Sequence, residues 1–423
     1  ALLTPALSEN HHTMVMAEQH RTIRRYLARM AKRQPVVLTI DNAQWGHNAL
    51  TLCSALLGAE EESTPLVLLI LVDDEALAEN SAEACDLRSL SSHSRVNVQE
   101  LGPLSPSEHR ELIVGTLGLA SSLVDVVVAQ TGGDALFSTS LLRYWVQADK
   151  LVPSRKGFVL RDGEAQNIPK TLVRVWGAQL DVLSEHLVDI KEEPLKQALE
   201  IAAALGVSVH DNEWRAACAI AGIAVPDGLV QGLAEINLVT IARLGWHFRH
   251  ASFRDHLELR AVRHGRWRAH HQHCADALSR MVARESQASS GRTWGRIGQH
   301  RILAEQFDEA CRPLLGGALA AREASDWHES HQIFDLLARA AEEVGDERIS
   351  VEAQIERVPC YLSEGKVAKA EELALRAEAQ AQALGDSSLT ARAQMARASI
   401  EFDRSETANA TSLLQRALEE LGP

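Results

Sequence analysis

The stretch Gly365–Asp386, with the sequence GKVAKAEELALRAEAQAQALGD, decides the fold of this chain. Small residues and leucines recur along it at helical spacing, and a glycine suited to a left-handed helix cap ends it. Two features recur at intervals of 40 residues. Helices are expected to end at Gly345-Asp346 and again at Gly385-Asp386. A small residue stands at 330, 370 and 410, three residues after Trp327, Val367 and Thr407. Two antiparallel helices in every 40 residues are typical of an α-solenoid, so we predict stacked helical repeats here.

The composition limits what the whole chain can be. It has 423 residues, of which 46% are hydrophobic and 24% charged, and its formal net charge is −14. These values exclude global disorder and a broadly basic nucleic-acid surface. The longest apolar run, 65–72, is far shorter than the roughly 20 residues of a membrane span. We see no secretion signal and no C-x-x-C pair, so we expect a cytoplasmic chain with reduced, mostly buried thiols and no membrane partner.

Three regions differ in their pattern of predicted helices and strands, and we assign them as domains 1–150, 151–265 and 266–423. The first alternates helices and strands, which predicts a parallel sheet with helical crossovers. Its expected elements are a helix over 16–33, a strand over 36–40, a helix over 49–57, a strand over 65–72 and a weaker strand over 96–101. A serine, a proline and a glutamate at 105, 106 and 108 predict a capped helix start. The region before residue 16, with His11 and His12, is expected to be frayed.

The second region changes to helices and short hairpins. We predict a hairpin over 152–160, helices over 171–183, 195–205, 212–221 and 227–235, and a second hairpin over 238–249. Helices followed by a two-stranded wing are typical of a winged-helix-like module. The third region is expected to be all helix. The predicted fold class is therefore mainly α, with a partial α/β domain, a winged-helix-like module and an α-solenoid.

The segment VVLTIDNAQW, residues 36–45, is the most informative for chemistry. A buried strand that ends in an acidic residue points its carboxylate into the crevice at the carboxyl edge of a parallel sheet, where phosphates bind. P-loop NTPases hold magnesium in this way. A strand ending in Asp is also common at simple turns, so Asp41 alone does not establish a nucleotide site.

The wider pattern resembles the STAND-type AAA+ ATPases of bacterial signalling. Asp41, Asn42, Gln44 and Trp45 stand at the places of that family's Walker B region, and the strand at 65–72 resembles its sensor strand. Thr131–Phe137, with Gly133 and Asp134, resembles its lid motif, and Trp246–Arg268 resembles the end of its winged-helix part. The resemblance implies a degenerate nucleotide and magnesium site formed by Asp41, Asn42, Gln44, Trp45, Gly133 and Asp134.

The runs Glu213–Cys218 and His270–Cys274 also resemble the C-terminal part of large serine/threonine protein kinases of the myxobacterial type. The chain lacks a kinase catalytic signature, and it lacks the G-x-x-x-x-G-K-[ST] phosphate loop. Asn42 replaces the second acid of the ATPase pattern, Ala135 replaces the lid proline, and Asp73-Asp74 stands where relatives often carry arginine. We therefore name no catalytic residue and expect no ATP hydrolysis by this chain alone. Binding of ATP and Mg²⁺ would require a phosphate loop upstream of Ala1. Because residue 1 is not Met, we expect the sequence to belong to a longer chain.

Other chemistries fit less well. His270 and Cys274 are spaced as a two-ligand metal clamp, but no second clamp matches them, so we predict no metal site. The basic residues Arg260, Arg263, Arg266 and Arg268 suggest a solvated helix or domain junction more than DNA contact. No Gly-x-Ser-x-Gly motif supports a hydrolase.

The sequence thus predicts a regulatory, protein-interaction region of a bacterial signal-transduction protein, in which the repeats hold a protein or peptide. Two alternatives remain: a fragment of an active ATPase or kinase whose catalytic part lies upstream, and a STAND-type transcriptional regulator.

Overall fold

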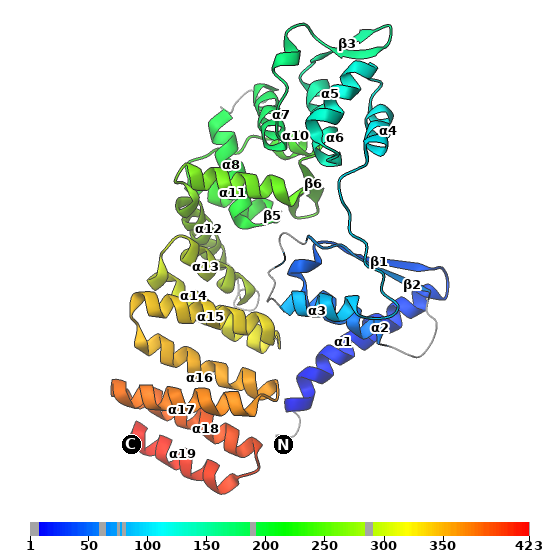
Figure 1. Cartoon of the computed structure of the whole chain (residues 1–423). Coiled ribbons are helices and arrows are strands. Elements are labelled where there is room, and N and C mark those ends of the chain that lie inside the picture. Colours follow the sequence, from blue (N-terminus) through cyan, green and yellow to red (C-terminus); the bar gives the residue numbers. More distant parts are fainter. Residues whose placement is uncertain are drawn as a thin grey trace. The chain divides into compact units, whose positions relative to one another are not determined.

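A computed structural model describes residues 8–58, 65–73, 77, 82–186, 192–283 and 291–422. This part of the chain is mainly helical, with 19 α-helices and three small sheets (Figure 1). It divides into two compact units. The first holds residues 1–101 with the short segments 361–369 and 400–407, and the second holds the rest. Each unit is described by itself below.

The first unit is built on a two-stranded parallel sheet. Its elements are α1 (Ser8–Ala31), β1 (Val36–Ile40), α2 (His47–Leu57), β2 (Leu66–Ile70) and α3 (Ala82–Ser91). β1 and β2 pair in register from Val36 opposite Leu66 to Ile40 opposite Ile70. One face of the sheet packs on a small core with Leu50, Cys53 and Leu90 at its centre. The parallel pairing that strand–helix alternation predicts is confirmed.

Two predictions in this unit are wrong. Residues 96–101 form no strand, and Val98 and Leu101 are exposed, because no neighbouring strand in the described residues offers them hydrogen bonds or cover. The N-terminal segment is not frayed from residue 11 either, since α1 begins at Ser8 and includes those residues. The prediction relied on the general tendency of chain termini to fray, whereas the helix extends to Ser8.

The second unit opens with a helical layer and a hairpin: α4 (Pro106–Thr116), α5 (Ser121–Thr131), α6 (Ala135–Gln147), β3 (Leu151–Ser154), β4 (Gly157–Leu160) and α7 (Leu172–His186). The predicted helix start is confirmed, because Ser105 and Glu108 form a reciprocal capping box with Pro106 in the first turn. Leu141, Trp145 and Val127 lie at the centre of its core.

The region that we predict to be winged-helix-like contains the following elements: α8 (Glu192–Leu205), β5 (Ser208–His210), α9 (Asp211–Ile220), α10 (Leu229–Glu235), β6 (Val239–Ala242), β7 (Gly245–Phe248) and α11 (Ala251–Arg263). The predicted hairpin β6–β7 gains β5 as a third strand, in the order β5–β7–β6. Sequence periodicity missed β5 because a strand of three residues is too short to alternate visibly. Trp246 packs edge-on against Trp214 and Phe248, with ring centroids 5.2 and 5.0 Å away.

The predicted helical repeats are present. The array contains α12 (Trp267–Val282), α13 (Gly291–Leu303), α14 (Phe307–Glu323), α15 (Trp327–Val344), α16 (Glu347–Ser363), α17 (Val367–Leu384), α18 (Ser387–Asp403) and α19 (Thr407–Leu421). Ser330, Ala370 and Ala410, which share one repeat position, are all buried. Gly345 and Gly385 take the left-handed conformation after their helices. The 40-residue period therefore corresponds to a repeated packing contact.

Close helix approach is clearest between α13 and α14. A Cβ atom added to Gly317 would lie 2.6 Å from the Cα of Gly295, so position 317 requires glycine. Five of the six cysteines are buried as free thiols, as expected, and Cys85 is exposed. None of the helices in the described part of the chain combines the length and apolar character that a membrane span requires.

Candidate functional site

The segment after β1 forms a tight polar turn. Asp41 accepts a hydrogen bond from the backbone N–H of Asn42 at 3.0 Å, and Asn42 adopts a left-handed conformation. Gln44 is buried, and its amide oxygen accepts from the N–H of Asp73 at 3.2 Å. Trp45 ends the short 3₁₀ turn Ala43–Trp45. Gln44 therefore ties the carboxyl ends of β1 and β2 together, and Asp41 is left exposed at that edge.

The two lid-motif residues lie in the second unit, at the start of α6. Asp134 caps this helix, because its carboxylate accepts from the N–H of Phe137 at 2.9 Å. Gly133 has a positive φ of 89°, and a Cβ atom there would meet the carbonyl oxygen of Leu104 at 2.7 Å. Asp134 therefore stabilises the start of α6, and Gly133 allows a tight turn beside Leu104. Since the site residues fall in different units, their joint action on a nucleotide stays a prediction.

A buried polar cluster next to that motif was not foreseen from the sequence. His109 on α4, Thr131 at the end of α5 and Ser138 on α6 form a triangle, with His109 Nε2 2.6 Å from Ser138 Oγ and 3.1 Å from Thr131 Oγ1. All three side chains are buried. A serine beside a histidine suggests a nucleophile, but this hydroxyl also donates to the carbonyl of Asp134 and no substrate reaches it. The cluster instead fastens three helices.

A second buried cluster is centred on Glu200 of α8. Its carboxylate accepts from Arg260, from Arg266 at 2.8 and 3.0 Å, and from Nε2 of His270 at 2.8 Å. Burial alone raises the pKa of Glu200, but the hydrogen bonds from His270 and Arg266 and the charges of Arg260 and Arg266 lower it to about 2. Two of the basic residues that might have reached DNA are therefore neutralised inside the protein.

The same part of α12 holds a buried histidine pair. Nδ1 of His271 lies 2.7 Å from Nδ1 of His300 on α13, and Trp267 packs edge-on against His271. Burial, and then the charge of His270, lower the pKa of His271 to about 4. Burial, and then the charges of His271 and Arg296, lower the pKa of His300 to about 3. Both rings are neutral at neutral pH, so one shares its N–H with the other.

His270 and Cys274, which are spaced as a two-ligand metal clamp, face different partners. His270 faces Glu200, and Sγ of Cys274 lies 3.8 Å from the carbonyl oxygen of Ile201. Within the described residues, no three His, Cys, Asp or Glu side chains gather as metal ligands would. His270 and His271 are both buried. Nε2 of His270 faces Glu200 and Nδ1 of His271 faces His300, whereas the other ring nitrogen of each has no hydrogen-bond partner among the described residues.

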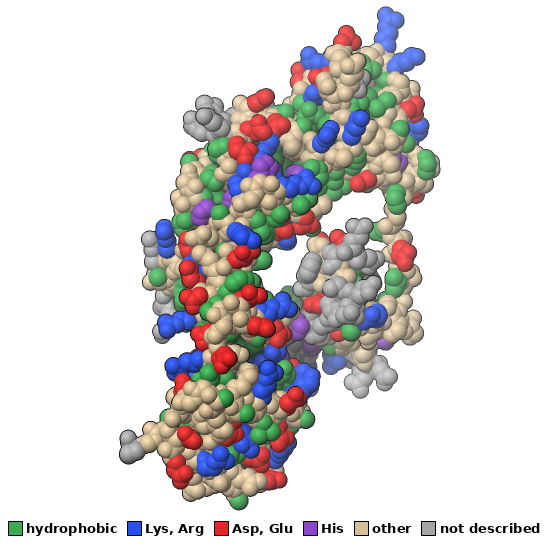
Figure 2. Space-filling view, turned by 60° about the vertical axis from the view of Figure 1, so that its left-hand side comes forward, with side chains coloured by type: hydrophobic (Ala, Val, Ile, Leu, Met, Phe, Trp, Pro, Cys, Tyr) green, Lys and Arg blue, Asp and Glu red, His purple; other side chains and the backbone are tan. Residues whose placement is uncertain are grey.

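A charged ladder runs across three helices of the array. Arg322 on α14 contacts Glu356 on α16 at 2.8 Å, and Arg392 on α18 contacts both Glu352 and Glu356 at 2.8 Å. We call the side of α14, α16 and α18 that carries these pairs the ladder face. Figure 2 shows Lys and Arg side chains interspersed with Asp and Glu side chains over the array. The ladder face is therefore charged but close to neutral.

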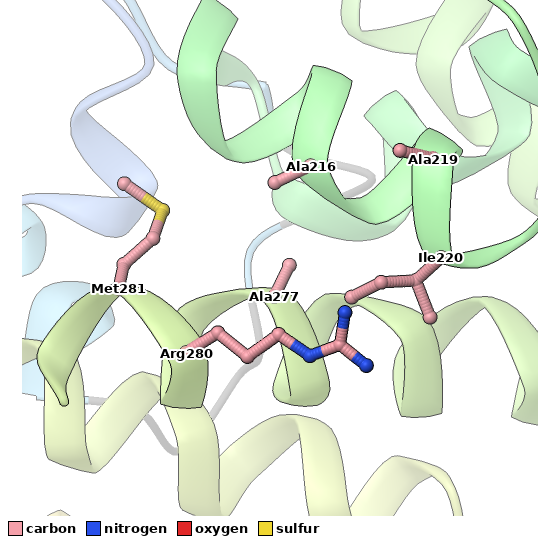
Figure 3. A pocket seen from close by; sticks show the side chains of 6 residues that line it. All are labelled: Ala216, Ala219, Ile220, Ala277, Arg280 and Met281. Atoms are coloured by element: carbon pink, nitrogen blue, oxygen red, sulfur yellow. The ribbon is translucent and has the colours of Figure 1, made fainter. Parts of the chain in front are cut away.

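A small hollow lies between α9 and α12, with a volume of about 240 Å³ (Figure 3). Its walls are Ala216, Ala219 and Ile220 on one helix and Ala277, Arg280 and Met281 on the other. Apart from the guanidinium, the lining is apolar. It offers no acid, base or nucleophile for catalysis.

Comparison with known proteins gives little further guidance. No protein-family description matches the chain, and no curated protein matches it. Among solved structures it is similar to a Signal Transduction ATPase with Numerous Domains (STAND) protein with a tetratricopeptide repeat sensor from Pyrococcus horikoshii. The identity is 12% and the TM-score 0.38, over 95% of this chain and 64% of that one. The chain thus spans less than two thirds of that protein, and any function must be argued from its own residues.

Proposed function

We propose that this chain is the regulatory, protein-interaction region of a bacterial signalling protein, acting in the cytoplasm. The array from α12 to α19 would hold a protein or peptide, and residues 1–150 would be a degenerate or truncated ATPase domain. We keep the domain boundaries 1–150, 151–265 and 266–423 as part of this proposal. The observation that carries it is the ladder face, a charged surface formed by three alternate helices, α14, α16 and α18.

The ladder face suits recognition for two reasons. Stacked helical repeats present one helix of each pair on a common side, where an extended ligand touches several repeats at once. The Arg392 and Glu352 side chains are also only partly buried, at 35% and 29% exposed, so a partner's charges can compete for them. We expect the preferred ligand to carry both acidic and basic groups, because the face presents both.

The residues after β1 support a role without ATP turnover. The amide of Asn42 stands where a general base would be needed, and it cannot accept a proton from water. Gln44 is used to join β1 to β2. Asp41, Asn42, Gln44, Trp45, Gly133 and Asp134 remain our proposed remnant of a nucleotide and Mg²⁺ site, and the whole sequence contains no phosphate loop to complete it.

A peptide selection tests the proposal. Peptides enriched by display against the full chain would be synthesised, and their affinity measured by fluorescence anisotropy. We expect Arg392→Ala to weaken binding by about tenfold or more, as loss of a hot-spot arginine does. Arg376→Ala, on an exposed position of α17, is the matched control and should leave the affinity unchanged. Peptides that bind equally well to both variants would contradict the proposal.

One observation favours the second candidate, a fragment of an active ATPase or kinase. The outer face of the β1–β2 sheet exposes Val37, Val67 and Leu69, although parallel sheets are normally covered on both faces. Further strands or a helix supplied upstream would cover it. The reading frame before Ala1 decides: a phosphate loop there favours the ATPase, and a His-Arg-Asp loop favours the kinase.

A further inference from the structure

One segment of the first unit concentrates positive charge in an otherwise acidic chain. Between Glu18 and Asp41 the sequence contains no acidic residue, although the formal net charge of the whole chain is −14. The same segment carries six basic residues, all with exposed side chains: Arg21, Arg24, Arg25, Arg29, Lys32 and Arg33. None of these side chains makes a hydrogen bond or an ion pair within the described part of the chain. Their charge is therefore available to a partner.

Four of these residues form a row. Arg21, Arg25 and Arg29 recur at every fourth position of α1, so they lie on one side of the helix, about 6 Å apart along its axis. Arg33 continues the row, because helical backbone hydrogen bonds persist through residue 34. We call these four arginines the basic ridge. From end to end it measures about 18 Å along the helix axis.

Helix stability explains only one end of the basic ridge. A basic residue in the last turn of a helix interacts favourably with the helix dipole, and Arg29 lies there. Arg21 and Arg25 lie one to two turns earlier, where this benefit is absent. Like charges four residues apart also destabilise a helix slightly. The ridge therefore costs the helix some stability, and a bound polyanion would reverse that cost.

An aromatic side chain lies beside the ridge. Tyr26, three residues before Arg29, is 64% exposed, more than any other aromatic side chain that the structure describes. Arginines next to an exposed ring are suited to a nucleic-acid strand, because guanidinium groups bind phosphates and bases stack on the ring. The even spacing of the arginines also suits a ligand whose negative charges recur regularly.

We propose that the basic ridge and Tyr26 form a binding site for a short stretch of single-stranded nucleic acid. The four guanidinium groups bind successive phosphates, and a base stacks on Tyr26. The acidic composition of the chain excludes a broadly basic surface, but this site is local. At 0.1 M salt, exposed charges more than about 10 Å away are largely screened, so the arginines determine the field at the ridge.

An anionic membrane fits the same helix less well. A helix that lies in a membrane surface needs a wide apolar face beside its basic face. On α1, Leu27 and Ala31 are buried within the first unit. The exposed aliphatic side chains next to the ridge are Ile23 and Met30, which are only 39% and 36% exposed. Little apolar surface is thus left for lipid.

Fluorescence anisotropy of the full chain with a labelled oligothymidine of about 12 nucleotides tests the proposal. Four phosphate contacts predict that the logarithm of the association constant falls with the logarithm of salt concentration with a slope of about −3. Arg25→Gln with Arg29→Gln should weaken binding about tenfold or more and reduce the slope to about −1.5. Arg339→Gln with Arg376→Gln is the matched control. It removes two exposed arginines from α15 and α17 and should leave both quantities nearly unchanged.

Tyr26 gives a second readout that separates stacking from charge. Tyr26→Ala should weaken binding about fivefold or more without changing the salt slope, because it removes a stacking surface and no charge. Tyr26→Phe should retain the affinity. Circular dichroism would show that all variants keep their helices.

Four outcomes would overturn the proposal. The oligothymidine could fail to bind at about 50 mM salt, or both double variants could lose affinity equally. Polyglutamate could compete as well as unlabelled oligothymidine, which would assign the ridge to acidic polypeptides. Phosphatidylserine vesicles could bind where the oligothymidine does not, which would assign it to a membrane. The experiment changes no residue of the ladder face, so this site and the proposed function can fail separately.

Discussion

In the first unit, the β1–β2 sheet packs one face on α2 and α3 and exposes Val37, Val67 and Leu69 on the other. In the second unit, larger cores surround Trp145 and Trp214, and the buried carboxylate of Glu200 is paired with Arg260, Arg266 and His270. The residues after β1 that suggest nucleotide chemistry thus lie at the edge of a sheet that is covered on one face only. The comparison shows that most of the buried core lies in the second unit, and that only a small core supports the edge of the sheet where Asp41 lies.

The largest effect should come from breaking the paired carboxylate of the second unit. Glu200→Leu leaves Arg260, Arg266 and His270 without their shared acceptor, so we expect a loss of about 3–5 kcal/mol in the free energy of unfolding. Urea unfolding measures it. Glu193→Gln is the control: this residue pairs with the same arginines but is half exposed, and the expected loss is about 1 kcal/mol or less. Equal losses would mean that burial does not decide the energetics of this cluster.

The pH dependence of stability should follow the buried groups of the second unit. The folded pKa values of His271 and His300, about 4 and 3, lie below the usual 6.5, so the unfolded chain binds more protons as the pH falls below that value. Stability should therefore decrease from pH 6.5 towards 4, by on the order of 3 kcal/mol for each of the two histidines. Glu200, with its lowered pKa, adds a further loss between pH 4.5 and 2.

Urea unfolding at several pH values tests this, with the double variant His271→Leu and His300→Leu as the comparison. We expect the variant to have a flatter stability profile between pH 6.5 and 4, because its titrating pair is gone. An unchanged slope would show that other groups cause the acid sensitivity.

A smaller effect distinguishes two neighbouring glycines of α14. Gly317→Ala forces backbone atoms apart at the contact with Gly295 and should cost about 1–3 kcal/mol. At Gly316 the nearest atom to an added Cβ is 3.7 Å away, so Gly316→Ala should be neutral or stabilise the helix by about 0.5–1 kcal/mol. Thermal unfolding of the two variants gives the comparison. Similar melting temperatures would contradict the close approach of α13 and α14.

The smallest effect should appear on the open face of the sheet. Val67→Thr changes an exposed side chain, so we expect the free energy of unfolding to change by about 0.5 kcal/mol or less. Leu50→Ala, on the covered side, should cost about 2–5 kcal/mol. A large loss at Val67, measured by urea unfolding, would show that this face is covered after all and would remove the contrast between the units.

Much of the fold could be predicted from the sequence, because local patterns report on local structure. The 40-residue repeat, the capped start at Ser105 and the strand over 36–40 depend on neighbouring residues and appear as expected. The strand predicted over 96–101 fails because a strand needs a partner, and alternation cannot show whether one exists.

The functional residues were harder to predict, because their pairings join distant segments. Glu200 meets His270 across 70 residues, and His271 meets His300 across 29. Glu200, which stands among apolar residues in the second half of α8, was the one signal of its cluster, since charged residues are rarely buried without partners. The two sets of lid and Walker B residues cannot be joined from local pattern alone, so that site stays a proposal.

Phosphate release from ATP and Mg²⁺ by the full chain tests the central claim most directly. The chain is proposed to be an interaction scaffold with a degenerate nucleotide site, so its rate should equal that of the Asp41→Ala variant and of buffer alone. Asp41 is exposed and bonds only to the neighbouring N–H in the described contacts, so the substitution should leave the fold intact. Turnover that Asp41→Ala abolishes would contradict the account.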